Sequence, residues 1–505
     1  MAEPHFLGID VGTSGVKVIL VSSSGDVAAA ATCPLTMQTP RPGWAEQDPA
    51  AWWDATVQSI HAVRRAKPDV AIAAVGISGQ MHSSVFLDGA GDVIRPALLW
   101  CDGRTTAECA EITARVGGEA RLRDLACNPA LEGFTLPKVL WLRAHEPEAY
   151  ARLACVLLPK DYIRYRLTGV LATDPSDASA TLMYDTAHLR WSDEILKAVD
   201  VPASIVPDVG GSAEVLGKVT AEAASVTTLA AGTPVVGGGA DNACGAAGVG
   251  AITPGEIVSS WGTSGTVLAP TSEPRVDPGL RAHTFCHVAP GVWYMMGVVL
   301  SAGGAFAWYR DQFAREHADP HEAARMLDRE AESVGAGAAG VTFLPYLQGE
   351  RTPHRDAAAR GSFLGLSLAH TRSHMTRAVL EGVAFALRDS LTILQELGLS
   401  PSSVLLTGGG ARSPFLRRLQ AEVFGLPVTT VNREEGPAYG AALLAAVGAG
   451  AYPDVATAAR STLTRAAPEH PRQGAHDDYT EAYARFRNAY PAARPDLLSV
   501  QRPLK

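Results

Sequence analysis

Two carboxylates in this sequence stand beside glycine-rich segments, where an acid can take part in phosphate chemistry. Asp10 ends an apolar run, and residues 12–15 that follow read Gly-Thr-Ser-Gly. Asp241 follows the apolar and glycine-rich segment 235–240. Phosphoryl transfer needs mainly positioning and charge stabilisation, with one acceptor for the proton of the attacking hydroxyl. We therefore predict that Asp241 is that acceptor and that Asp10 binds Mg²⁺, which offsets its repulsion from phosphate.

Both carboxylates also have structural interpretations. An Asp before a tight turn commonly accepts hydrogen bonds from the N–H groups of that turn, which is the alternative for Asp10. An Asp before a helix commonly caps it, which is the alternative for Asp241. Capping and catalysis can coexist in one residue.

The tetrapeptide Gly-Thr-Ser-Gly occurs a second time, at residues 262–265, again between two strand-like runs. Glycine lets the backbone approach an oxyanion closely, and Thr and Ser add hydroxyl donors. The repeat predicts two phosphate-holding hairpins, with two ordinary tight turns as the alternative. Ser260 stands where the first copy has Asp10, so only the first turn would carry an acid for the metal.

Other glycine patterns give weaker signals. Residues 405–413 run from a strand through Gly408, Gly409 and Gly410 to Ser413. This backbone could pack against a flat adenosine, and Ser413 would cap the helix that follows. No Gly-x-x-x-x-Gly-Lys-Ser/Thr loop is present. The Gly-x-Gly-x-x-Gly match at 335–340 does not open a helix, so we interpret it as a connection.

The elements that position these residues form two similar halves. In the first half, a hairpin, a strand at 27–32, a helix opened by Asp48 and Pro49, and a strand at 70–78 give the order βββαβ. The second half has the hairpin 257–268, then expected elements at 292–300 (strand), 304 onward (helix), 373–397 (helix), 404–407 (strand), 413–424 (helix), 427–431 (strand) and 436 onward (helix). This alternation predicts mainly parallel sheets covered on both faces, with the ligand in the cleft between the halves. We place the boundary near 249–255.

Composition limits the class of protein. The chain has 505 residues, 47% of them hydrophobic, and a formal net charge of −9. These values predict a globular protein of a few domains that binds small molecules rather than nucleic acid. The start of the chain does not read as a signal peptide, and no apolar stretch is long enough to span a bilayer. Seven cysteines without paired spacing predict reduced thiols in the cytoplasm.

Two further clusters have competing interpretations. His283, Cys286 and His287 could be taken for metal ligands, but a closed zinc site needs a fourth ligand that their neighbourhood lacks, so we do not predict one. Near the end of the chain, aromatic residues recur at helical spacing: Tyr479, Tyr483, Phe486 and Tyr490. They could dock a second copy and make a homodimer, but a helix packed on its own domain is the favoured interpretation.

Together these segments resemble the FGGY carbohydrate kinases, from about residue 7 to residue 450. The supporting stretches are Gly-Phe-Thr-Leu-Pro-Lys at 133–138, Gly-Glu-Arg-Thr-Pro-His at 349–354, and the pattern over 361–381 that follows the second family signature. The resemblance implies an α/β fold of two duplicated actin-like, ribonuclease H-like domains with an interdomain cleft. The first, 1–248, would hold the sugar site, the first phosphate hairpin and the catalytic Asp. The second, 249–505, would hold the second hairpin, the adenosine site and a helical tail.

Within the family the chain is most similar to the xylulokinases, through Gly-Gln-Met-His at 79–82, Trp-Cys-Asp-Gly-Arg at 100–104 and Leu-Pro-Lys-Asp-Tyr at 158–162. This similarity implies that Asp241 is the catalytic base. It implies sugar contacts at Met81, His82, Asp241 and Asn242. It implies ATP contacts at Gly12, Thr13, Ser14, Gly262, Thr263, Gly303, Gly409, Gly410 and Ser413. From the residues alone, His82 is more often a satisfied structural histidine.

The activity that the resemblance implies is Mg²⁺- and ATP-dependent phosphorylation of D-xylulose at its 5-hydroxyl, in pentose catabolism. One alternative is a kinase for another ketopentose or a pentitol, such as ribulose, arabinitol or xylitol. An alternative of another class is a non-catalytic actin-like nucleotide switch, which would need neither the Met81-His82 pair nor Asp241-Asn242.

Overall fold

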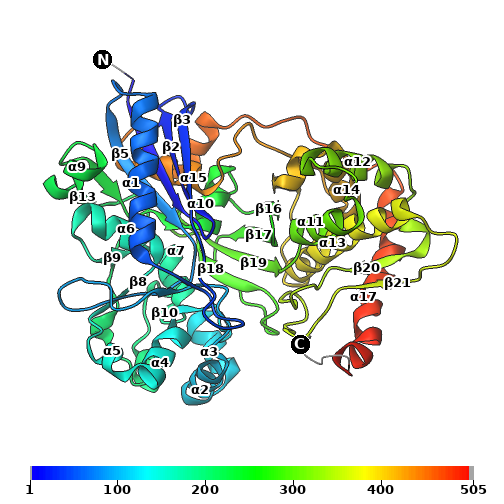
Figure 1. Cartoon of the computed structure of the whole chain (residues 1–505), viewed down its shortest axis with the longest axis horizontal. Coiled ribbons are helices and arrows are strands. Elements are labelled where there is room, and N and C mark those ends of the chain that lie inside the picture. Colours follow the sequence, from blue (N-terminus) through cyan, green and yellow to red (C-terminus); the bar gives the residue numbers. More distant parts are fainter. Residues whose placement is uncertain (1–2, 500–505) are drawn as a thin grey trace.

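The computed structural model describes the backbone of residues 3–499 and the side chains of residues 3–494. Two α/β halves lie side by side and are joined through their centre (Figure 1). The ends of the two predicted domains, at residues 1 and 505, lie outside the described residues.

The first half is built on a sheet in the order β13-β14-β5-β1-β2-β3, with β15 also paired to β5. Its strands are β1 (His5–Val11), β2 (Gly15–Ser22), β3 (Val27–Pro34), β5 (Ile72–Gly79), β13 (Val215–Lys218), β14 (Pro234–Val236) and β15 (Gly239–Ala240). Helix α1 (Pro49–Ala66) begins as expected, because the Asp48 side chain accepts a hydrogen bond from the N–H of Ala50 at 2.9 Å. The hairpin, third strand, helix and fourth strand predicted for this half are therefore present.

Further helices of the first half cover this sheet and build a lower lobe around residues 100–210 (Figure 1). They are α2 (Thr106–Val116), α3 (Glu119–Ala126), α4 (Thr135–His145), α5 (Pro147–Ala151), α6 (Pro159–Thr168), α7 (Pro175–Ala178), α8 (Asp193–Ala198), α9 (Ala221–Thr227) and α10 (Asp241–Gly248). Short strand pairs complete the lobe: β4 (Glu46–Gln47) with β7 (Ala97–Leu98), β6 (Val85–Leu87) with β8 (Cys155–Leu157), β9 (Ala172–Thr173) with β12 (Asp208–Val209), and β10 (Tyr184–Asp185) with β11 (Arg190–Trp191).

The sheet of the second half has the order β18-β19-β17-β16-β22-β23, in which β19-β17-β16-β22-β23 repeats β3-β2-β1-β5-β14 of the first half. The extra strand lies at opposite edges, β18 beside β19 and β13 beside β14. Its strands are β16 (Glu256–Trp261), β17 (Gly265–Thr271), β18 (His283–Cys286), β19 (Trp293–Val299), β22 (Ser403–Gly408) and β23 (Val428–Thr429). Its helices are α11 (Gly303–Phe313), α12 (Pro320–Glu332), α13 (Arg372–Glu396), α14 (Pro414–Phe424) and α17 (Ala475–Ser499), with the pair β20 (Thr342–Leu344) and β21 (Ser362–Leu364) at one side. The duplicated α/β architecture predicted from the two turns is confirmed.

The expectation of mainly parallel sheets was wrong. In the first half, β1, β2 and β3 follow one another through short connections and pair antiparallel. In the second half, β16 pairs antiparallel with β17 and β17 with β19, while β18, which lies between β17 and β19 in the sequence, pairs antiparallel with β19. Only strands reached after a helix pair in parallel with the first strand, as β5 does with β1 and β22 with β16. A hairpin joins antiparallel strands, whereas parallel neighbours require a crossover connection. The alternation of helices and strands late in each half therefore did not indicate the direction of the strands at the start of that half.

Helix α15 (Pro437–Gly448) comes from the second half of the sequence but packs on β1 and β5 of the first sheet. The approach is close: a Cβ added to Gly8 would lie 2.1 Å from the carbonyl oxygen of Ala438, and one added to Gly76 would lie 1.9 Å from that of Ala441. Helix α15 also packs on α10, and α16 (Val455–Thr462) follows it. Glycine is required at these strand positions because the helix backbone occupies the side-chain space.

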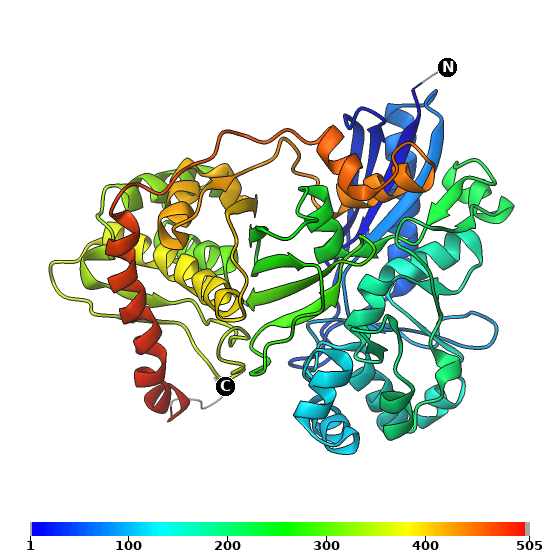
Figure 2. The same cartoon turned by 180° about the vertical axis from the view of Figure 1, so that it is seen from behind.

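Helix α17 lies along the second half (Figure 2). Its four aromatic residues, Tyr479, Tyr483, Phe486 and Tyr490, are buried in the core of that half. The favoured interpretation, a helix packed on its own domain, is therefore confirmed, and this face is not available to dock a second copy.

All seven cysteines are unpaired in the described part of the chain. Within the same residues, no helix combines the length and the apolar character needed to cross a membrane.

Candidate active site

The two Gly-Thr-Ser-Gly turns hold equivalent places in the two sheets. Asp10 is the next-to-last residue of β1 and pairs with Lys17 across the hairpin and with Ser78 on the parallel neighbour. Ser260 is the next-to-last residue of β16 and pairs with Thr266 and Thr407 in the same way. The turns therefore hold matching register positions at the ends of equivalent strands, and only the first is accompanied by an acid.

Asp10 has an unusual electrostatic position. Its Oδ1 atom is buried and has no hydrogen-bond partner among the described residues. Burial raises the pKa of this carboxyl to about 6, against the lowering effect of the Lys17 ammonium. The alternative interpretation, an Asp that accepts hydrogen bonds from the turn, is not what the structure has. A carboxylate held this way suits a cation ligand.

Asp241 is the first residue of α10, at the end of the glycine-rich segment. The side chain does not cap the helix, since the cap position belongs to Ala240. Instead Oδ1 accepts from the backbone N–H of Asn242 at 2.7 Å and from its side-chain amide at 2.9 Å. Burial, followed by the negative charge of Asp10, raises the pKa of Asp241 to about 7, against the lowering effect of these hydrogen bonds.

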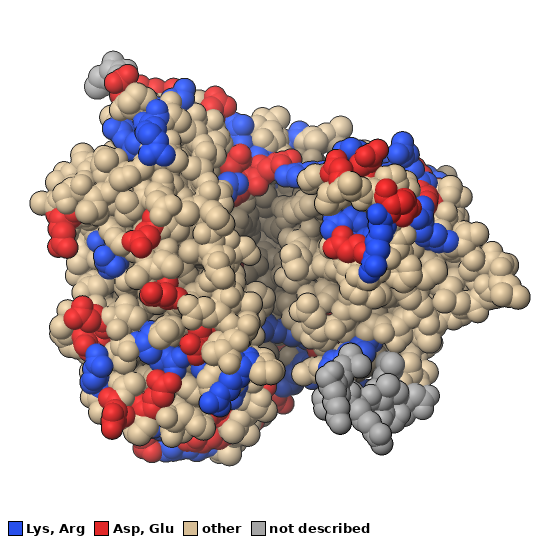
Figure 3. Space-filling model, viewed as in Figure 1, with Lys and Arg blue, Asp and Glu red and all other residues tan. Residues whose placement is uncertain are grey.

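A cleft of about 870 Å³ runs from Asp241 into the second half. Figure 3 shows the surface hollowed between the halves, with charged side chains around the upper mouth. The cleft is lined by three of the predicted residues, Asp241, Asn242 and Gly409. It is also lined by Ser260, Thr266, Gly408, Arg412, Arg417, Glu434, Glu435 and Gly436, among others. It therefore connects the carboxylate of Asp241 with the third glycine cluster.

The glycines of the second half come together around the second turn. The N–H of Gly303, at the start of α11, donates to the carbonyl oxygen of Gly262 at 2.8 Å, and the N–H of Gly304 donates to that of Thr263 at 2.9 Å. A Cβ on Gly410 would lie 2.7 Å from the Trp261 side chain, next to this turn. One compact backbone surface thus carries most of the residues predicted to bind ATP in this half.

Ser413 is placed differently. Its hydroxyl accepts a hydrogen bond from the N–H of Leu416 at 3.1 Å and so caps α14, and the residue is not among those that line the cleft. The helix-capping role expected for Ser413 is confirmed, whereas its contact with adenosine stays a prediction.

The first turn is tied to the segment that carries the predicted sugar contacts. The Thr13 hydroxyl donates to Oε1 of Gln80 and accepts from Nε1 of Trp100, both at 3.0 Å. The Thr13 carbonyl accepts from Nε2 of Gln47 at 2.7 Å. Because its hydroxyl is engaged, Thr13 offers a ligand its backbone N–H rather than its side chain, while Ser14 is exposed.

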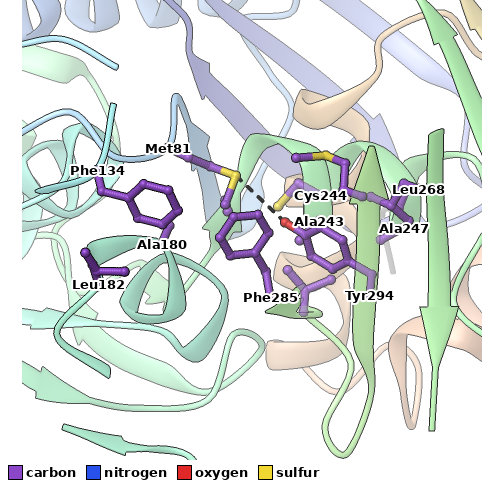
Figure 4. Close-up of a cluster of buried hydrophobic side chains, with 14 of the residues drawn as sticks. Met81, Phe134, Ala180, Leu182, Ala243, Cys244, Ala247, Leu268, Phe285 and Tyr294 are labelled. Carbon is purple, nitrogen blue, oxygen red and sulfur yellow. Dashed lines mark hydrogen bonds between the residues drawn. The ribbon is translucent and has the colours of Figure 1, made fainter. Parts of the chain in front are cut away.

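Met81 lies where the two halves meet. Its sulfur accepts from the side-chain amide of Asn242 at 3.5 Å and from the hydroxyl of Tyr294 at 3.8 Å. The second of these is the dashed line in Figure 4, where the rings of Phe134 and Phe285 flank the same region. Two residues predicted as sugar contacts, from segments 161 positions apart, are therefore adjacent.

His82 is buried and held in a fixed orientation. Its Nδ1–H donates to the carbonyl oxygen of Ala180 at 2.6 Å, which makes Nε2 the acceptor of the ring. Burial lowers the pKa of His82 well below its usual value, so the ring is neutral. The backbone has φ of 68°, in the left-handed region. Its carbonyl accepts from the hydroxyl of Thr135 at 3.0 Å and from the ammonium of Lys138 at 3.1 Å.

The His283, Cys286 and His287 cluster makes other contacts. His283 Nδ1 is 2.9 Å from Oδ1 of Asn128, and His287 Nε2 is 3.2 Å from the carbonyl of Ala251. No group of three His, Cys, Asp or Glu side chains within the described residues is arranged to hold a metal ion.

Several neighbours of the site were not predicted. Tyr294 contacts Met81 from β19, and Lys138 supports His82 from α4. Lys138 was visible only as part of a family motif, since burial and the carbonyl contact do not show in sequence. Tyr294 had no signal, because the sequence predicts a strand at 292–300 but does not show which residues its side chains contact.

Known proteins are similar to this chain over most of its length. Residues 5–248 match the N-terminal domain of the FGGY family of carbohydrate kinases, and residues 257–449 match its C-terminal domain. The xylulose kinase of Escherichia coli is 40% identical over 483 residues, which cover 95% of this chain and 96% of that protein. The xylulose kinase of Bacillus subtilis is 38% identical over 488 residues, 96% of each. The crystal structure of xylulose kinase from Rhodospirillum rubrum superposes with a TM-score of 0.90 at 32% identity, covering 98% of this chain and 99% of that one.

Proposed function

Because the chain belongs to the FGGY family of carbohydrate kinases, we propose that it transfers the γ-phosphoryl group of ATP to the 5-hydroxyl of D-xylulose, giving D-xylulose 5-phosphate and ADP. The observation that carries this proposal is the position of Asp241. It lies at one end of the interdomain cleft, beside Met81 through Asn242 and within the electrostatic reach of Asp10.

Asp241 has the features of a general base. Both hydrogen bonds from Asn242 reach Oδ1, and no donor in the described part of the chain reaches Oδ2, so Oδ2 is available to the attacking hydroxyl. A pKa of about 7 keeps a large fraction of the carboxylate ionised near neutral pH and makes it a better proton acceptor than an ordinary Asp. As the hydroxyl oxygen attacks the γ-phosphorus, its proton passes to Asp241 while the bond to the β–γ bridging oxygen breaks.

The two turns would hold the phosphates from opposite sides. The N–H of Gly12 donates to the carbonyl oxygen of Gly15 at 3.1 Å and closes the first turn. The backbone N–H groups of Thr13 and Ser14, and those of Gly262 and Thr263, would supply the fixed donors that stabilise the charge developing on phosphoryl oxygens. In the second half, Gly409 lines the cleft and is exposed beside it, which suits contact with adenosine. Closure of the halves would exclude water, which would otherwise accept the phosphoryl group.

Asp10 fits a magnesium ligand. The buried, unpartnered Oδ1 and the raised pKa show a carboxylate that lacks the donors an ionised group needs. When bound there, Mg²⁺ would neutralise charge on the nucleotide phosphates and orient them. Asp10 would hold the ion beside the first turn, and without the ion its negative charge contributes to the raised pKa of Asp241.

The sugar would be recognised by a small set of groups. Nε2 of His82 accepts a hydrogen bond from a sugar hydroxyl, and the Asn242 amide offers a polar contact beside Asp241. The thioether of Met81 packs on carbon. A site built this way disfavours ligands that leave its polar groups unpaired. The names of the relatives from Bacillus subtilis and Escherichia coli support D-xylulose, and another ketopentose or a pentitol is the second candidate.

Three further statements belong to this proposal. We place the division between the domains at residues 248 and 249, next to the end of α10. We place the protein in the cytoplasm, where its seven unpaired cysteines would stay reduced. A homodimer stays a prediction, and its surface is not the aromatic face of α17.

The test is ADP release with Mg·ATP across D-xylulose, D-ribulose, L-ribulose, L-xylulose, D-arabinitol, xylitol and glycerol. We expect the highest kcat/KM for D-xylulose. Asp241→Ala should abolish the activity, whereas Asp54→Ala, a change at an exposed position of α1, should leave it intact. A pentitol or ribulose with the highest kcat/KM overturns the substrate but not the class. If no sugar stimulates ADP release, the kinase proposal fails and the nucleotide switch replaces it.

A further inference from the structure

A group of charged side chains lies fully buried behind the site, outside the cleft. The ammonium of Lys160 is 2.5 Å from Oδ1 of Asp161, 3.0 Å from Oδ1 of Asp174 and 3.1 Å from Oδ2 of Asp177. The guanidinium of Arg164 is 3.1 Å from Asp161. The side chains of Lys160, Asp161, Asp174 and Arg164 are 0% exposed. The proposed reaction uses none of them directly.

Several carboxylates surround the Lys160 ammonium in this cluster. Burial alone would lower the pKa of Lys160, but three carboxylates outweigh that effect and raise it. Burial raises the pKa of Asp177 well above its usual value. Such a cluster is rigid, because moving any member leaves a buried charge unpaired.

A hydrogen-bond chain leads from this cluster to the proposed base. Oδ2 of Asp174 accepts from the hydroxyl of Ser176 at 2.6 Å. The same hydroxyl oxygen accepts from the backbone N–H of Ala240 at 2.9 Å. Ala240 directly precedes Asp241. The chain therefore joins an immobile ion cluster in the first half to the residue that starts α10.

The start of α10 depends on this contact. Ala240 occupies the cap position, and no side chain of its own segment caps the helix. The strand before it, β15, is two residues long and pairs only with β5. The Ser176 hydroxyl thus gives the Ala240 N–H its partner, and it also closes the space beside Gly239, where a Cβ would lie 3.2 Å from it.

We propose that Ser176, anchored by Asp174 and the Lys160 cluster, is a positioning residue that fixes the junction of β15 and α10 and thereby the carboxylate of Asp241. The inference rests on the proposed function only in naming Asp241 as the base. A carboxylate displaced by a fraction of an ångström loses in-line geometry, and this lowers kcat more than substrate affinity.

The chain offers a matched control. The hydroxyl of Ser212 also donates to Oδ2 of Asp174, at 2.8 Å, but does not reach Ala240. Ser176→Ala and Ser212→Ala each remove one donor from the same carboxylate, and both residues are buried. Only Ser176→Ala also leaves the N–H of Ala240 without a partner.

The first measurement is steady-state kinetics with the sugar that the wild-type protein phosphorylates best. Ser176→Ala should lower kcat by at least tenfold with KM for sugar and ATP within threefold, whereas Ser212→Ala should keep kcat within twofold. Equal losses in the two variants, or an unchanged kcat in Ser176→Ala, overturn the inference.

The second measurement does not depend on activity. Hydrogen–deuterium exchange of the peptide containing residues 239–245 should be at least tenfold faster in Ser176→Ala than in Ser212→Ala or the wild type. Equal protection in all three overturns the inference even if the protein phosphorylates no sugar. If Ser176→Ala does not fold, Ser176→Cys, which keeps the size but weakens the acceptor, should show intermediate exchange and kcat; wild-type values in the Cys variant would overturn the inference.

Discussion

Asp10 and Asp241 approach each other from two strand ends of the first sheet, and the negative charge of Asp10 contributes to raising the pKa of Asp241 to about 7. Burial acts in the same direction on both, with the pKa of Asp10 at about 6. Two carboxyl groups that titrate near neutral pH suit the roles of cation ligand for Asp10 and base for Asp241. Their charges, and with them the rate and the stability of the protein, should therefore depend on pH.

The rate should depend on ionisation of Asp241. Because the base must be ionised to accept a proton, kcat/KM for D-xylulose should rise with pH to a plateau. Its midpoint should lie below about 7, because Mg²⁺ bound by Asp10 would offset the charge of Asp10 while burial, the larger cause of the raised pKa, remains. Below the midpoint it should fall about tenfold per pH unit. Initial rates between pH 5.5 and 8.5 measure this, with Asp54→Asn as the control of unchanged profile. A profile flat over this range would contradict the assignment of Asp241 as the base.

The buried carboxylate of Asp241 should also lower the free energy of unfolding at high pH. Because the pKa of Asp241 is raised in the folded state, the folded protein binds this proton more tightly than the unfolded chain does. The resulting contribution of Asp241 to the free energy of unfolding is fully present below about pH 4 and is lost as the pH rises through about 7. Asp241→Asn removes that loss. The ligand-free variant should be more stable than the wild type by about 1–2 kcal/mol at pH 8, allowing for the partial exposure of the group.

The measurement is thermal unfolding without ligands at pH 5 and pH 8. The gain from Asp241→Asn should shrink toward pH 5, where the wild-type carboxyl is protonated. A gain of equal size at both pH values would indicate a packing effect instead of a titration effect.

Lys138 should control sugar affinity through His82. Lys138→Met leaves the carbonyl of His82 short of a donor in a buried place, which costs about 1–3 kcal/mol. We expect KM for D-xylulose to rise about tenfold or more, with KM for ATP nearly unchanged. Kinetics at varied sugar and at varied ATP give the two constants.

Thr135→Val, which removes the other donor to the same carbonyl, should shift the sugar KM in the same direction. Lys197→Met, at an exposed position of α8, is the control and should have no effect. Equal changes in the KM values for sugar and ATP would show that Lys138 acts on the whole fold and not on His82.

The packing of α15 on the first sheet should be sensitive to one methyl group. Gly76→Ala places a Cβ against the Ala441 carbonyl, where the backbone has no room, so the variant should lose about 2–3 kcal/mol of stability. Gly89→Ala is the control, since a Cβ there meets nothing within 4 Å. Thermal unfolding compares the two. Equal melting temperatures would mean that α15 does not pack as described.

Local features of the fold could be predicted from the sequence because local chemistry causes them. Asp48 and Pro49 begin α1, Ser413 caps α14, and the two Gly-Thr-Ser-Gly turns close hairpins. Strand direction was predicted less well, because the pairing of three consecutive strands depends on connection length and not on apolar pattern.

The sequence by itself determined which residues could do chemistry: an acid beside each of two glycine-rich segments of the first half, a repeated phosphate-type turn, and the Met81-His82 pair. Tertiary structure alone decided what surrounds them. Ser176 reaches Ala240 across 64 positions, Lys138 reaches His82 across 56, and Tyr294 reaches Met81 across 213. The physical reason is that pKa and orientation depend on burial and on partners brought close by packing, and neither is encoded in the spacing of neighbouring residues.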